Sequence, residues 1–458
     1  MSLTQPMKVL FVMRSMSHLR YHKSIIEALK ERGHVVNVVY DPRFSDEKGL
    51  MRAQKYCADN QCGLIEASVP RGPGYFILRH TRDLLSWRRY LTNKDVGHLK
   101  PFRQDWRGHL PFLDKVFLKF PGGEWMLQTR WFACILSLFE SLIPPNRRIR
   151  QDLVGLRPDV VIASPVNMRN SSIEVEYLKA AVVLNVPTAI QVFSWDNLTV
   201  RGLFHIVPDT LLCWNDVQAE EAVKYQGIEK DRIRIVGAVM FDTWFKSKLT
   251  ASSREEFCKR YGLNPEYPIV AYLGSARNIA KDETATIREL RKTLDSSEKL
   301  KVKNTQIILR VHPANYKSYT DFTLHKTVEV PARGEFIESE DALKLFYDTL
   351  THSVAVVQIN TSGAIDAIVA GSPCISMLYP EFKEQQLETI HFKQLMQSGA
   401  SDLPRNVEEC VACIERLLSG YDDRKEARAT FVSRFIRPRG VSVLAGEWVA
   451  SELERLRK

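Results

Sequence analysis

The sequence predicts an α/β protein with two Rossmann-like, doubly wound domains that face a cleft, followed by C-terminal helices. Its 458 residues exceed the usual size of one hydrophobic core, so two domains are expected. Short β-branched runs alternate with segments whose apolar residues recur at helical spacing. This alternation begins twice, near residues 7 and 268, and each strand–helix–strand start predicts a parallel sheet.

The first half opens on a strand, a helix and a second strand. The strand is expected at 7–13, the amphipathic helix at 17–34 and the second strand at 35–40. Residues 41–70 carry no clear pattern, and residues 71–150 interrupt the alternation, with an amphipathic helix expected inside them at 132–142. The alternation then resumes, with strands predicted at 158–164, 187–194, 209–214 and 233–238 and helices at 174–185 and 216–227.

The second half repeats the same order. Strands are predicted at 268–275, 305–313, 354–360 and 374–377, and helices at 283–294, 341–350 and 362–371. Three helices finish the chain, the last at 442–458. The weakly patterned residues 239–252 join the two halves. We therefore expect an N-terminal domain of residues 1–240 and a C-terminal domain of residues 241–458 that includes the terminal helices.

The composition narrows the class of protein. With 45% apolar and 26% charged residues, the chain is typical of a soluble globular protein. No apolar run reaches the roughly 18 residues that span a bilayer, and VLFVM near the start is too short for a signal peptide, so the cytoplasm is the expected location. The eight cysteines lie mostly in apolar segments, and the CxxC of Cys410 and Cys413 has no second ligand pair, so no metal is expected.

The positive charge is concentrated in residues 71–150. The net charge of the chain is +10, and this segment alone holds 15 Lys and Arg against 6 Asp and Glu, together with 13 aromatic residues. Nucleic acid, an anionic membrane surface or a phosphorylated substrate would each fit such a segment. A solvated, irregular insertion without a partner is the alternative.

Polar corners follow three predicted strands of the second half. Ligands bind at the carboxyl ends of the strands in open α/β sheets, and small residues, a guanidinium, an imidazole and a helix N-terminus suit a phosphate. Each residue alone has an ordinary interpretation as a cap or a surface ion pair. Asp366, about one helical turn after Ser362, would bind a ribose hydroxyl or be an ordinary acid on the helix surface. The corners hold Gly274 and Ser275, then Arg310 and His312, then Thr361, Ser362 and Gly363.

Two corners of the first half also carry reactive side chains. MRSMSH places Arg14, Ser15 and His18 after the first strand, where they face a ligand or cap the next helix. In SWDNLTVRG (194–202), an acid lies between an aromatic residue and an amide, which suits a general base or an acceptor of sugar hydroxyls. An Asx-turn that ends the strand is the alternative. The residues at issue there are Trp195, Asp196 and Asn197. GxGxxG, GxxxxGK[ST] and GxSxG are all absent after these strands.

These corners, in this order, resemble those of the GT-B glycosyltransferase superfamily. The opening strand, turn and helix ending in RGH, and VGAVMFD at 236–242, look like its first unit and linker, although Val239 stands near the usual proline. SWDNLTVRG followed by CWNDVQAEEA (213–222) is similar to members that act in bacterial surface-polysaccharide synthesis. RVHP (310–313) with NTSGAIDAIVAGSP (360–373) resembles capsule, Kdo-type and CDP-glycerol transferases.

The resemblance implies a glycosyltransferase that moves a sugar from a nucleotide-sugar to a surface-glycan or lipid-linked acceptor, without a metal or other cofactor. The C-terminal domain would bind the donor through the three corners and Asp366. The N-terminal domain would bind the acceptor, with His18 or Asp196 catalytic and Arg14, Ser15, Trp195 and Asn197 on the acceptor side. Glu381 and Glu388 have the spacing of a glutamate pair found in retaining members but follow a later strand, so their role stays open.

Residues 71–150 fit the acceptor side of such an enzyme. We expect them to make a peripheral membrane contact at the inner face of the membrane, and no nucleic-acid partner is expected because no recognised motif accompanies the charge. Three other functions share the fold: a UDP-N-acetylglucosamine 2-epimerase-like isomerase, a CDP-polyol phosphotransferase and a catalytically silent scaffold. The isomerase would need no acceptor segment.

Overall fold

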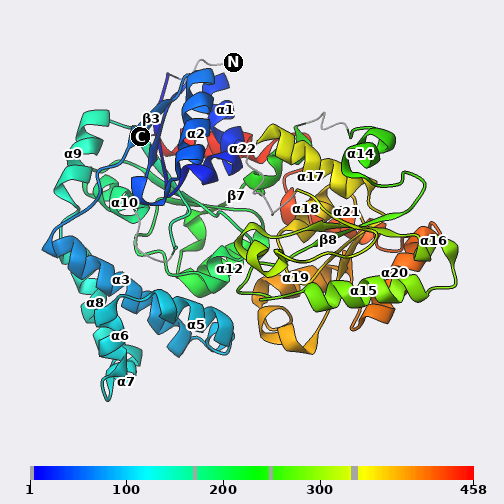
Figure 1. Cartoon of the computed structure of the whole chain (residues 1–458). Coiled ribbons are helices and arrows are strands. Elements are labelled where there is room, and N and C mark those ends of the chain that lie inside the picture. Colours follow the sequence, from blue (N-terminus) through cyan, green and yellow to red (C-terminus); the bar gives the residue numbers. More distant parts are fainter. Residues whose placement is uncertain (1–4, 169–172, 247–250, 332–338, 458) are drawn as a thin grey trace. The chain divides into compact units, whose positions relative to one another are not determined.

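The computed structural model describes residues 5–168, 173–246, 251–331 and 339–457 (Figure 1). The chain forms two compact units: unit 1 comprises Met1–Phe245 and Ser433–Lys458, and unit 2 comprises Lys246–Val432. Each unit is built on its own parallel β-sheet with helices on its faces, so the predicted fold class is confirmed.

The sheet of unit 1 has seven parallel strands in the order β3-β2-β1-β4-β5-β6-β7. The strand order reverses direction between β1 and β4, which is where ligands bind in such sheets. The central strands are buried on both faces, because helices cover the sheet on each side. The strands are β1 (Lys8–Met13), β2 (Val35–Tyr40), β3 (Gly63–Glu66), β4 (Val160–Ser164), β5 (Thr188–Gln191), β6 (Thr210–Cys213) and β7 (Ile233–Ile235).

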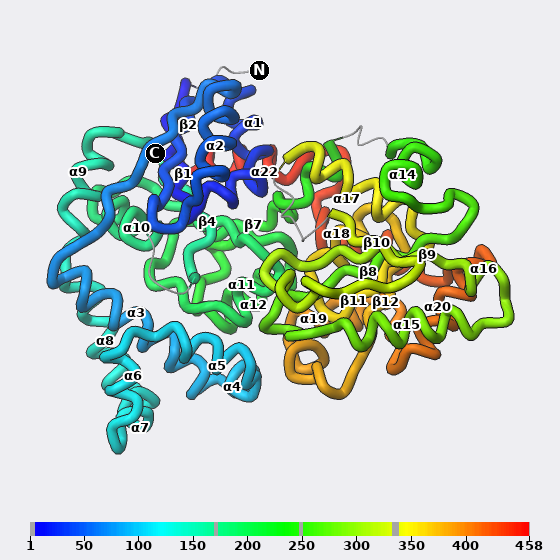
Figure 2. Tube along the Cα trace, viewed as in Figure 1, coloured from blue at the N-terminus to red at the C-terminus, as the bar shows by residue number. Residues whose placement is uncertain are grey.

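The helices of unit 1 fall into those that cover the sheet and a group, α3–α8, that lies beyond it (Figures 1 and 2). The α-helices are α1 (Lys23–Glu31), α2 (Glu47–Asp59), α3 (Pro73–Thr92), α4 (Lys94–Gly97), α5 (Lys100–His109), α6 (Phe112–Lys119), α7 (Gly123–Gln128), α8 (Arg130–Leu142), α9 (Arg147–Leu156), α10 (Ile173–Val183), α11 (Asn197–Val200), α12 (Asp216–Gln226), α13 (Asp242–Phe245) and α22 (Ala445–Leu456). Shorter or irregular turns are η1 (Met16–Tyr21), η2 (Pro42–Phe44), η3 (Lys230–Arg232) and η4 (Val239–Phe241), and the π-helix η7 (Val432–Ile436) connects back to this unit.

Unit 2 has six parallel strands in the order β10-β9-β8-β11-β12-β13, which repeats the arrangement of unit 1. The strands are β8 (Ile269–Leu273), β9 (Gln306–Arg310), β10 (Thr327–Glu329), β11 (Ala355–Gln358), β12 (Cys374–Ser376) and β13 (Ser401–Asp402). The helices are α14 (Arg254–Tyr261), α15 (Thr284–Ser296), α16 (Leu300–Lys303), η5 (Pro313–Tyr319), α17 (Glu340–His352), α18 (Gly363–Val369), η6 (Pro380–Gln385), α19 (Ile390–Ser398), α20 (Val407–Leu418) and α21 (Lys425–Phe431).

The last helix belongs to unit 1, whereas the sequence predicts all terminal helices in the C-terminal domain. Val449, Ala450 and Leu453 of α22 join the same apolar core as α1. The Arg32 guanidinium pairs with Glu447 at 2.6 Å and Glu454 at 2.8 Å. Apolar periodicity predicts the helix but does not say which of two similar cores it covers.

Asp242 ties the linker to the same helix. Its carboxylate accepts hydrogen bonds from the backbone N–H groups of Ala445, at 3.0 Å, and Gly446, at 2.8 Å, at the start of α22. A Cβ on Gly446 would stand 2.5 Å from the backbone of Ser24, so α22 approaches α1 as closely as it does only because that residue is glycine. The predicted boundary after residue 240 therefore lies inside unit 1, which continues to Phe245.

Local predictions differ from the structure in three places. The helix expected at 17–34 is two elements, η1 and α1, that meet at His22. The unpatterned residues 41–70 contain α2 and the edge strand β3. The interruption at 71–150 is helical almost throughout, from α3 to the start of α9. No helix in the described part of the chain is both long and apolar enough to cross a membrane.

Candidate functional site

The three polar corners of unit 2 lie at the carboxyl ends of adjacent strands. Leu273, the last residue of β8, is in register with Arg310 of β9 on one side and with Gln358 of β11 on the other. The strand order reverses direction at β8, so the corners surround the position where a doubly wound sheet binds its ligand. The topology thus brings together the residues that the sequence predicts for the donor.

The corner after β8 is organised by a buried carboxylate. Ser275 is fully buried, and its backbone N–H donates to Glu283 at 2.7 Å while its hydroxyl donates at 3.2 Å. The Tyr319 hydroxyl donates to the same carboxylate at 3.2 Å. Burial raises the pKa of Glu283 to about 7, against the opposing effect of these hydrogen bonds. Gly274 leaves space beside the β9 corner, because a Cβ on it would contact the backbone nitrogen of His312 at 3.4 Å.

The corner after β9 places a cation and an imidazole side by side in the chain. The Arg310 guanidinium lies over the ring of Phe346 in α17, 4.6 Å from its centroid. His312 caps η5, since its Nδ1 accepts a hydrogen bond from the Ala314 N–H at 3.1 Å. Burial lowers the pKa of His312, which favours the neutral imidazole that this cap needs.

At the corner after β11, the two hydroxyls have different roles. Thr361 Oγ1 accepts from the Gly363 N–H at 3.3 Å, whereas the Ser362 side chain is exposed and makes no capping bond. Gly363 packs closely against β8, because a Cβ on it would stand 2.8 Å from Leu273 Cδ1 and would need that side chain to shift. Asp366 is half-buried in the first turn of α18. The ordinary capping role therefore falls to Thr361 and leaves the Ser362 hydroxyl at the surface.

The two glutamates of uncertain role lie around η6. Glu381 is exposed in η6, and Glu388 pairs with Lys383 at 3.2 Å. Asn360 connects this segment to the β11 corner, because its Nδ2 donates to the Gln385 carbonyl oxygen at 2.6 Å.

In unit 1, the corner after β1 presents a half-buried, neutral histidine. The His18 ring lies against Phe193 with 4.9 Å between centroids, and burial, aided by Arg14 and Arg20, lowers its pKa to about 4. Arg14 stacks on Phe44 at 3.7 Å. The Ser15 hydroxyl accepts from the Ser17 N–H at 3.3 Å and caps η1. Phe193 follows β5, so it brings the β1 corner against the SWDNLTVRG segment.

The acid of that segment is held by its neighbours. Asp196 accepts hydrogen bonds from the Ser194 hydroxyl and from Arg201, the latter at 3.2 Å. Its side chain is 14% exposed. Trp195 beside it is buried. Asp196 thus lies beside a guanidinium at the carboxyl end of β5 with limited access to solvent.

Asn197 has a structural role that the sequence does not reveal. It is buried, its Oδ1 accepts from the N–H groups of Phe193 and Ser194 at 2.9 Å, and its Nδ2 donates to Asn167 Oδ1 at 2.7 Å. Asn167 in turn donates to the Gly202 carbonyl oxygen at 3.0 Å. With both ends of its amide bonded inside the protein, Asn197 shapes the loop, which is not the acceptor contact expected of it.

Residues of α3 hold the same loop from the other side. Arg89 donates to the carbonyl oxygens of Leu198, at 2.8 Å, and of Thr199 and Arg201. The Tyr90 hydroxyl donates to Val200 at 2.7 Å. Burial lowers the pKa of Arg89, but nearby Tyr90, Tyr225 and Glu221 oppose this effect. The segment 71–150 is therefore anchored directly to the candidate acceptor-side loop.

Glu221 is a second buried group that the sequence analysis did not select. It lies in α12, is buried, and has a pKa raised to about 8 by burial, with Arg89 acting against the rise and Asp196 and Glu220 adding to it. The signal was the QAEEA string after β6, where the second glutamate falls on the buried face of the helix. A carboxyl group that is protonated near neutral pH can donate as well as accept hydrogen bonds.

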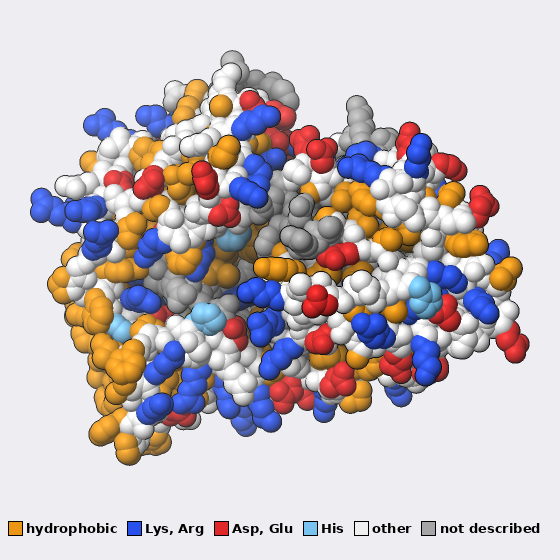
Figure 3. Space-filling model, viewed as in Figure 1, with side chains coloured by type: hydrophobic (Ala, Val, Ile, Leu, Met, Phe, Trp, Pro, Cys, Tyr) orange, Lys and Arg blue, Asp and Glu red, His pale blue; other side chains and the backbone are white. Residues whose placement is uncertain are grey.

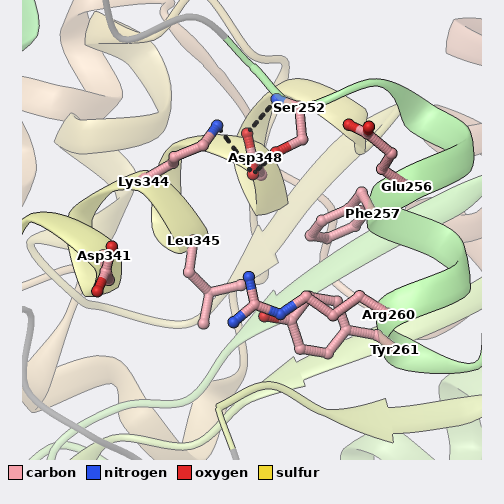
Figure 4. A pocket seen from close by; sticks show the side chains of 9 residues that line it. All are labelled: Ser252, Glu256, Phe257, Arg260, Tyr261, Asp341, Lys344, Leu345 and Asp348. Atoms are coloured by element: carbon pink, nitrogen blue, oxygen red, sulfur yellow. Dashed lines mark hydrogen bonds and ion pairs between the residues drawn. The ribbon is translucent and has the colours of Figure 1, made fainter.

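A cavity of about 350 Å³ lies between α14 and α17 in unit 2 and holds none of the predicted site residues (Figure 4). Its Asp348 accepts from Ser252 N–H at 2.9 Å and from the Ser252 hydroxyl at 2.8 Å, and pairs with Lys344 at 3.6 Å. Across the described ranges, no group of three or more His, Cys, Asp and Glu side chains could hold a metal ion. The lining residues are Ser252, Glu256, Phe257, Arg260, Tyr261, Asp341, Lys344, Leu345 and Asp348.

The fold is similar to those of solved UDP-GlcNAc 2-epimerases and glycosyltransferases. The sequence matches no protein-family model and no curated protein. A UDP-GlcNAc 2-epimerase from Methanocaldococcus jannaschii is 12% identical with a TM-score of 0.56, over 98% of this chain and 100% of the other. The UDP-GlcNAc 2-epimerase from Neisseria meningitidis, solved with UDP-GlcNAc bound, is 11% identical with a TM-score of 0.55. The match covers 98% of this chain and 100% of the other.

A glycosyltransferase from Rickettsia africae is 12% identical with a TM-score of 0.53, over 99% of this chain and 100% of the other. The chain therefore has the GT-B fold, as the resemblance in its sequence predicted. At these identities the likeness concerns the fold, and it includes transferases and epimerases alike.

Proposed function

We propose that this protein is a glycosyltransferase that moves a sugar from a nucleotide-sugar donor to a surface-glycan or lipid-linked acceptor without a bound metal. The proposal assigns the donor to unit 2 and the acceptor to unit 1. The observation that carries it is the attachment of α3 to the loop after β5 through Arg89 and Tyr90. An enzyme that only isomerises a sugar nucleotide has no need of an added segment fixed to this loop.

On the donor side, the proposal rests on three corners that meet at one sheet edge. Arg310 supplies a permanent positive charge. The exposed Ser362 hydroxyl adds a hydrogen-bonding group that does not cap the helix. The buried Gly274–Ser275 turn keeps backbone atoms close to the same edge. These groups would compensate the charge of a departing diphosphate, which is the part a metal takes in other enzymes.

On the acceptor side, His18 is the group that we assign as base. Its imidazole is neutral at ordinary pH because its pKa lies near 4, so one ring nitrogen is unprotonated and its lone pair can accept the proton of an acceptor hydroxyl. Asp196, held by Ser194 and Arg201, would accept a hydrogen bond from a sugar hydroxyl or fix the orientation of the loop. Arg14 and Trp195 complete this corner.

A thermal-shift panel with UDP, GDP, CDP, CMP, ADP and dTDP tests the donor assignment. A ligand that binds only the folded state stabilises it by about 2.7 kcal/mol at a hundred times its Kd. We expect one nucleotide to raise the melting temperature and Arg310→Ala to abolish that rise. A shift that Arg310→Ala leaves intact would place the nucleotide elsewhere. A response to CDP alone would favour transfer of a polyol phosphate, and no response to any of them would favour a silent scaffold.

The epimerase is the second candidate, because several of the similar structures carry that name. Incubation with UDP-GlcNAc in D₂O, without an acceptor, separates the two. An epimerase would yield the 2-epimer with deuterium at C2, as seen by proton NMR. A transferase would leave C2 unchanged and at most hydrolyse the donor slowly. Epimerisation that persists in Arg89→Lys would argue against the transferase.

A further inference from the structure

Helix α8 is amphipathic in the opposite sense to a helix of a soluble protein. Trp131, Ile135, Leu138, Phe139 and Leu142 recur at helical spacing, and all are exposed, Leu142 by 68%. The one charged residue in the body of the helix points inward. A soluble helix normally buries such a stripe and exposes its charge.

The inward charge of α8 is Glu140, which belongs to a buried ion cluster. Its carboxylate pairs with Arg82 of α3 at 2.7 Å and with Lys179 of α10 at 2.8 Å. The pKa of Glu140 is lowered to about 2, because these cations outweigh the effect of burial. The cluster fixes α8 against α3 and α10, and so fixes its apolar stripe outward.

Helix α6 repeats this inversion. Phe112, Val116 and Phe120 are exposed, Phe112 by 76%. Asp114 is buried, and its carboxylate lies 2.7 Å from Nδ1 of His80. Trp125 of α7 is 69% exposed. We call the exposed side chains together the apolar helical face: Phe112, Leu113, Val116, Phe120, Trp125, Trp131, Ile135, Leu138, Phe139 and Leu142.

The residue types on this face are unusual for the chain. Among the described residues, every exposed Trp and Phe lies between residues 76 and 139, and the large exposed apolar residues elsewhere are aliphatic, Met or Tyr. Figure 3 shows apolar side chains gathered over the region of α6–α8, with Lys and Arg beside them. Trp and other aromatic residues are favoured at the boundary between water and lipid.

The charge around the face selects its partner. The segment has 15 Lys and Arg against 6 Asp and Glu. Three of those acids, Asp83, Asp114 and Glu140, are turned inward, and Arg82 and Arg89 are buried as well, so the surface keeps a strong excess of positive charge. A second copy of the chain would bring two positive surfaces together, which is repulsive. An anionic lipid surface offers negatively charged headgroups for the Lys and Arg side chains and an apolar acyl-chain region for the apolar side chains.

We propose that the apolar helical face docks on the surface of an anionic phospholipid bilayer, with its aromatic and aliphatic side chains in the headgroup region and the neighbouring Lys and Arg on lipid phosphates. The inference stands on the exposure and charge of α6–α8 and does not require the transferase reaction. If that reaction is correct, α3 connects the docked helices to the loop at residues 198–201, which would select acceptors that are themselves membrane-bound.

Co-sedimentation of the full chain with vesicles tests the proposal. One set of vesicles contains phosphatidylcholine alone, and the other contains phosphatidylglycerol as well. We expect binding to the second set, weakening as salt increases, because surface charges are screened over about 10 Å at 0.1 M salt. Little binding to phosphatidylcholine alone is expected. Failure to sediment with phosphatidylglycerol vesicles at low salt would overturn the proposal.

A double variant, Trp131→Ser with Leu138→Ser, tests the face itself. Both substitutions remove apolar surface that would leave water on docking, so we expect at least about a tenfold rise in the lipid concentration for half-binding. Leu300→Ser, at a site in unit 2 that is 71% exposed, is the matched control and should bind as the wild type does. Circular dichroism and nucleotide-induced thermal shifts show whether the double variant is folded.

Two further results would count against a bilayer partner. Equal vesicle binding by the double variant and the wild type would place the contact elsewhere. A wild-type chain that dimerises, ignores vesicles and becomes monomeric in the double variant would show that the face binds a second copy. Quenching of tryptophan fluorescence by brominated lipids, lost in Trp125→Phe with Trp131→Phe, would place these rings at headgroup depth.

Discussion

The guanidinium group of Arg89 donates a hydrogen bond to the backbone carbonyl oxygen of Leu198, 2.8 Å away and 109 residues later in the chain. Arg89 is buried, and it bonds the carbonyl oxygens of Thr199 and Arg201 as well. One side chain of α3 thus bonds two carbonyl groups of α11, which is only four residues long, and the carbonyl group of the residue that follows it. The conformation of the candidate acceptor loop depends on a helix outside the doubly wound sheet.

Replacing Arg89 with Lys should loosen this loop. Lysine keeps the positive charge but cannot reach three carbonyl oxygens with one planar fork. We expect a fall of about tenfold or more in acceptor-dependent kcat/KM and a stability loss of about 1–3 kcal/mol. The nucleotide-induced thermal shift should be unchanged. Arg88→Lys, whose guanidinium only donates to the Gln128 carbonyl oxygen, is the control and should leave turnover unaltered.

Ser362→Ala and Thr361→Val should separate binding from capping. Ser362 makes no cap bond, so Ser362→Ala should leave the free energy of unfolding within about 0.5 kcal/mol of wild type while weakening nucleotide binding. Thr361 Oγ1 accepts from Gly363 N–H, so Thr361→Val should cost about 1 kcal/mol of stability. Urea denaturation and calorimetric titration measure the two quantities. If the Ser362→Ala variant binds nucleotide as tightly as the wild type does, the Ser362 hydroxyl does not contact the nucleotide.

Glu283 should make the free energy of unfolding decrease as the pH rises. Its pKa in the folded protein is about 7 against an ordinary value of 4.5, so the folded state holds the proton more tightly. Stability is then highest below the ordinary value and declines as pH rises to about 7, by about 3 kcal/mol in total. Glu283→Gln, which cannot titrate, should show a shallower decline over the same window. Parallel stability curves for variant and wild type would show that the carboxyl does not titrate there.

His18→Asn should reduce turnover by about 10²- to 10⁴-fold if His18 is the base. Burial favours the neutral ring, so its pKa near 4 predicts no inflection in kcat/KM near the ordinary histidine value of 6.5. An acid limb should appear only towards pH 4. His98→Asn is the control, because that imidazole lies in the segment 71–150 and makes a local hydrogen bond to the Lys94 carbonyl oxygen. Full activity of His18→Asn would assign the base elsewhere.

The strands that position the candidate site are readable from the sequence for a simple reason. β1, β4, β8 and β11 are buried on both faces, so each is a continuous apolar run followed by a polar corner. β3 is an edge strand with no fully buried residue and therefore leaves no such run. The helices α6 and α8 could not be oriented from their patterns, because their apolar stripes face outward.

The details of the site depend on contacts between distant residues. The amide pair of Asn167 and Asn197 is 30 residues apart, and both are as polar as true ligand contacts, so sequence alone does not separate a loop-shaping amide from a binding one. The same holds for Glu283, whose burial follows from Tyr272 and Tyr319 folding over it. By contrast, sheet topology fixes which corners are neighbours, so the sequence predicts that the three corners of unit 2 lie at one sheet edge, which the structure confirms.

The return of residues 433–457 to unit 1 has a consequence for biosynthesis. Unit 2 is one continuous stretch of chain, whereas unit 1 is built from the segments on both sides of it, because α22 covers α1 and the Asp242 carboxylate bonds the first N–H groups of α22. As the chain leaves the ribosome, the apolar side of α1 stays uncovered while all of unit 2 is made. Unit 2 is therefore able to fold before unit 1 is complete, because α1 is covered only once α22 has been synthesised.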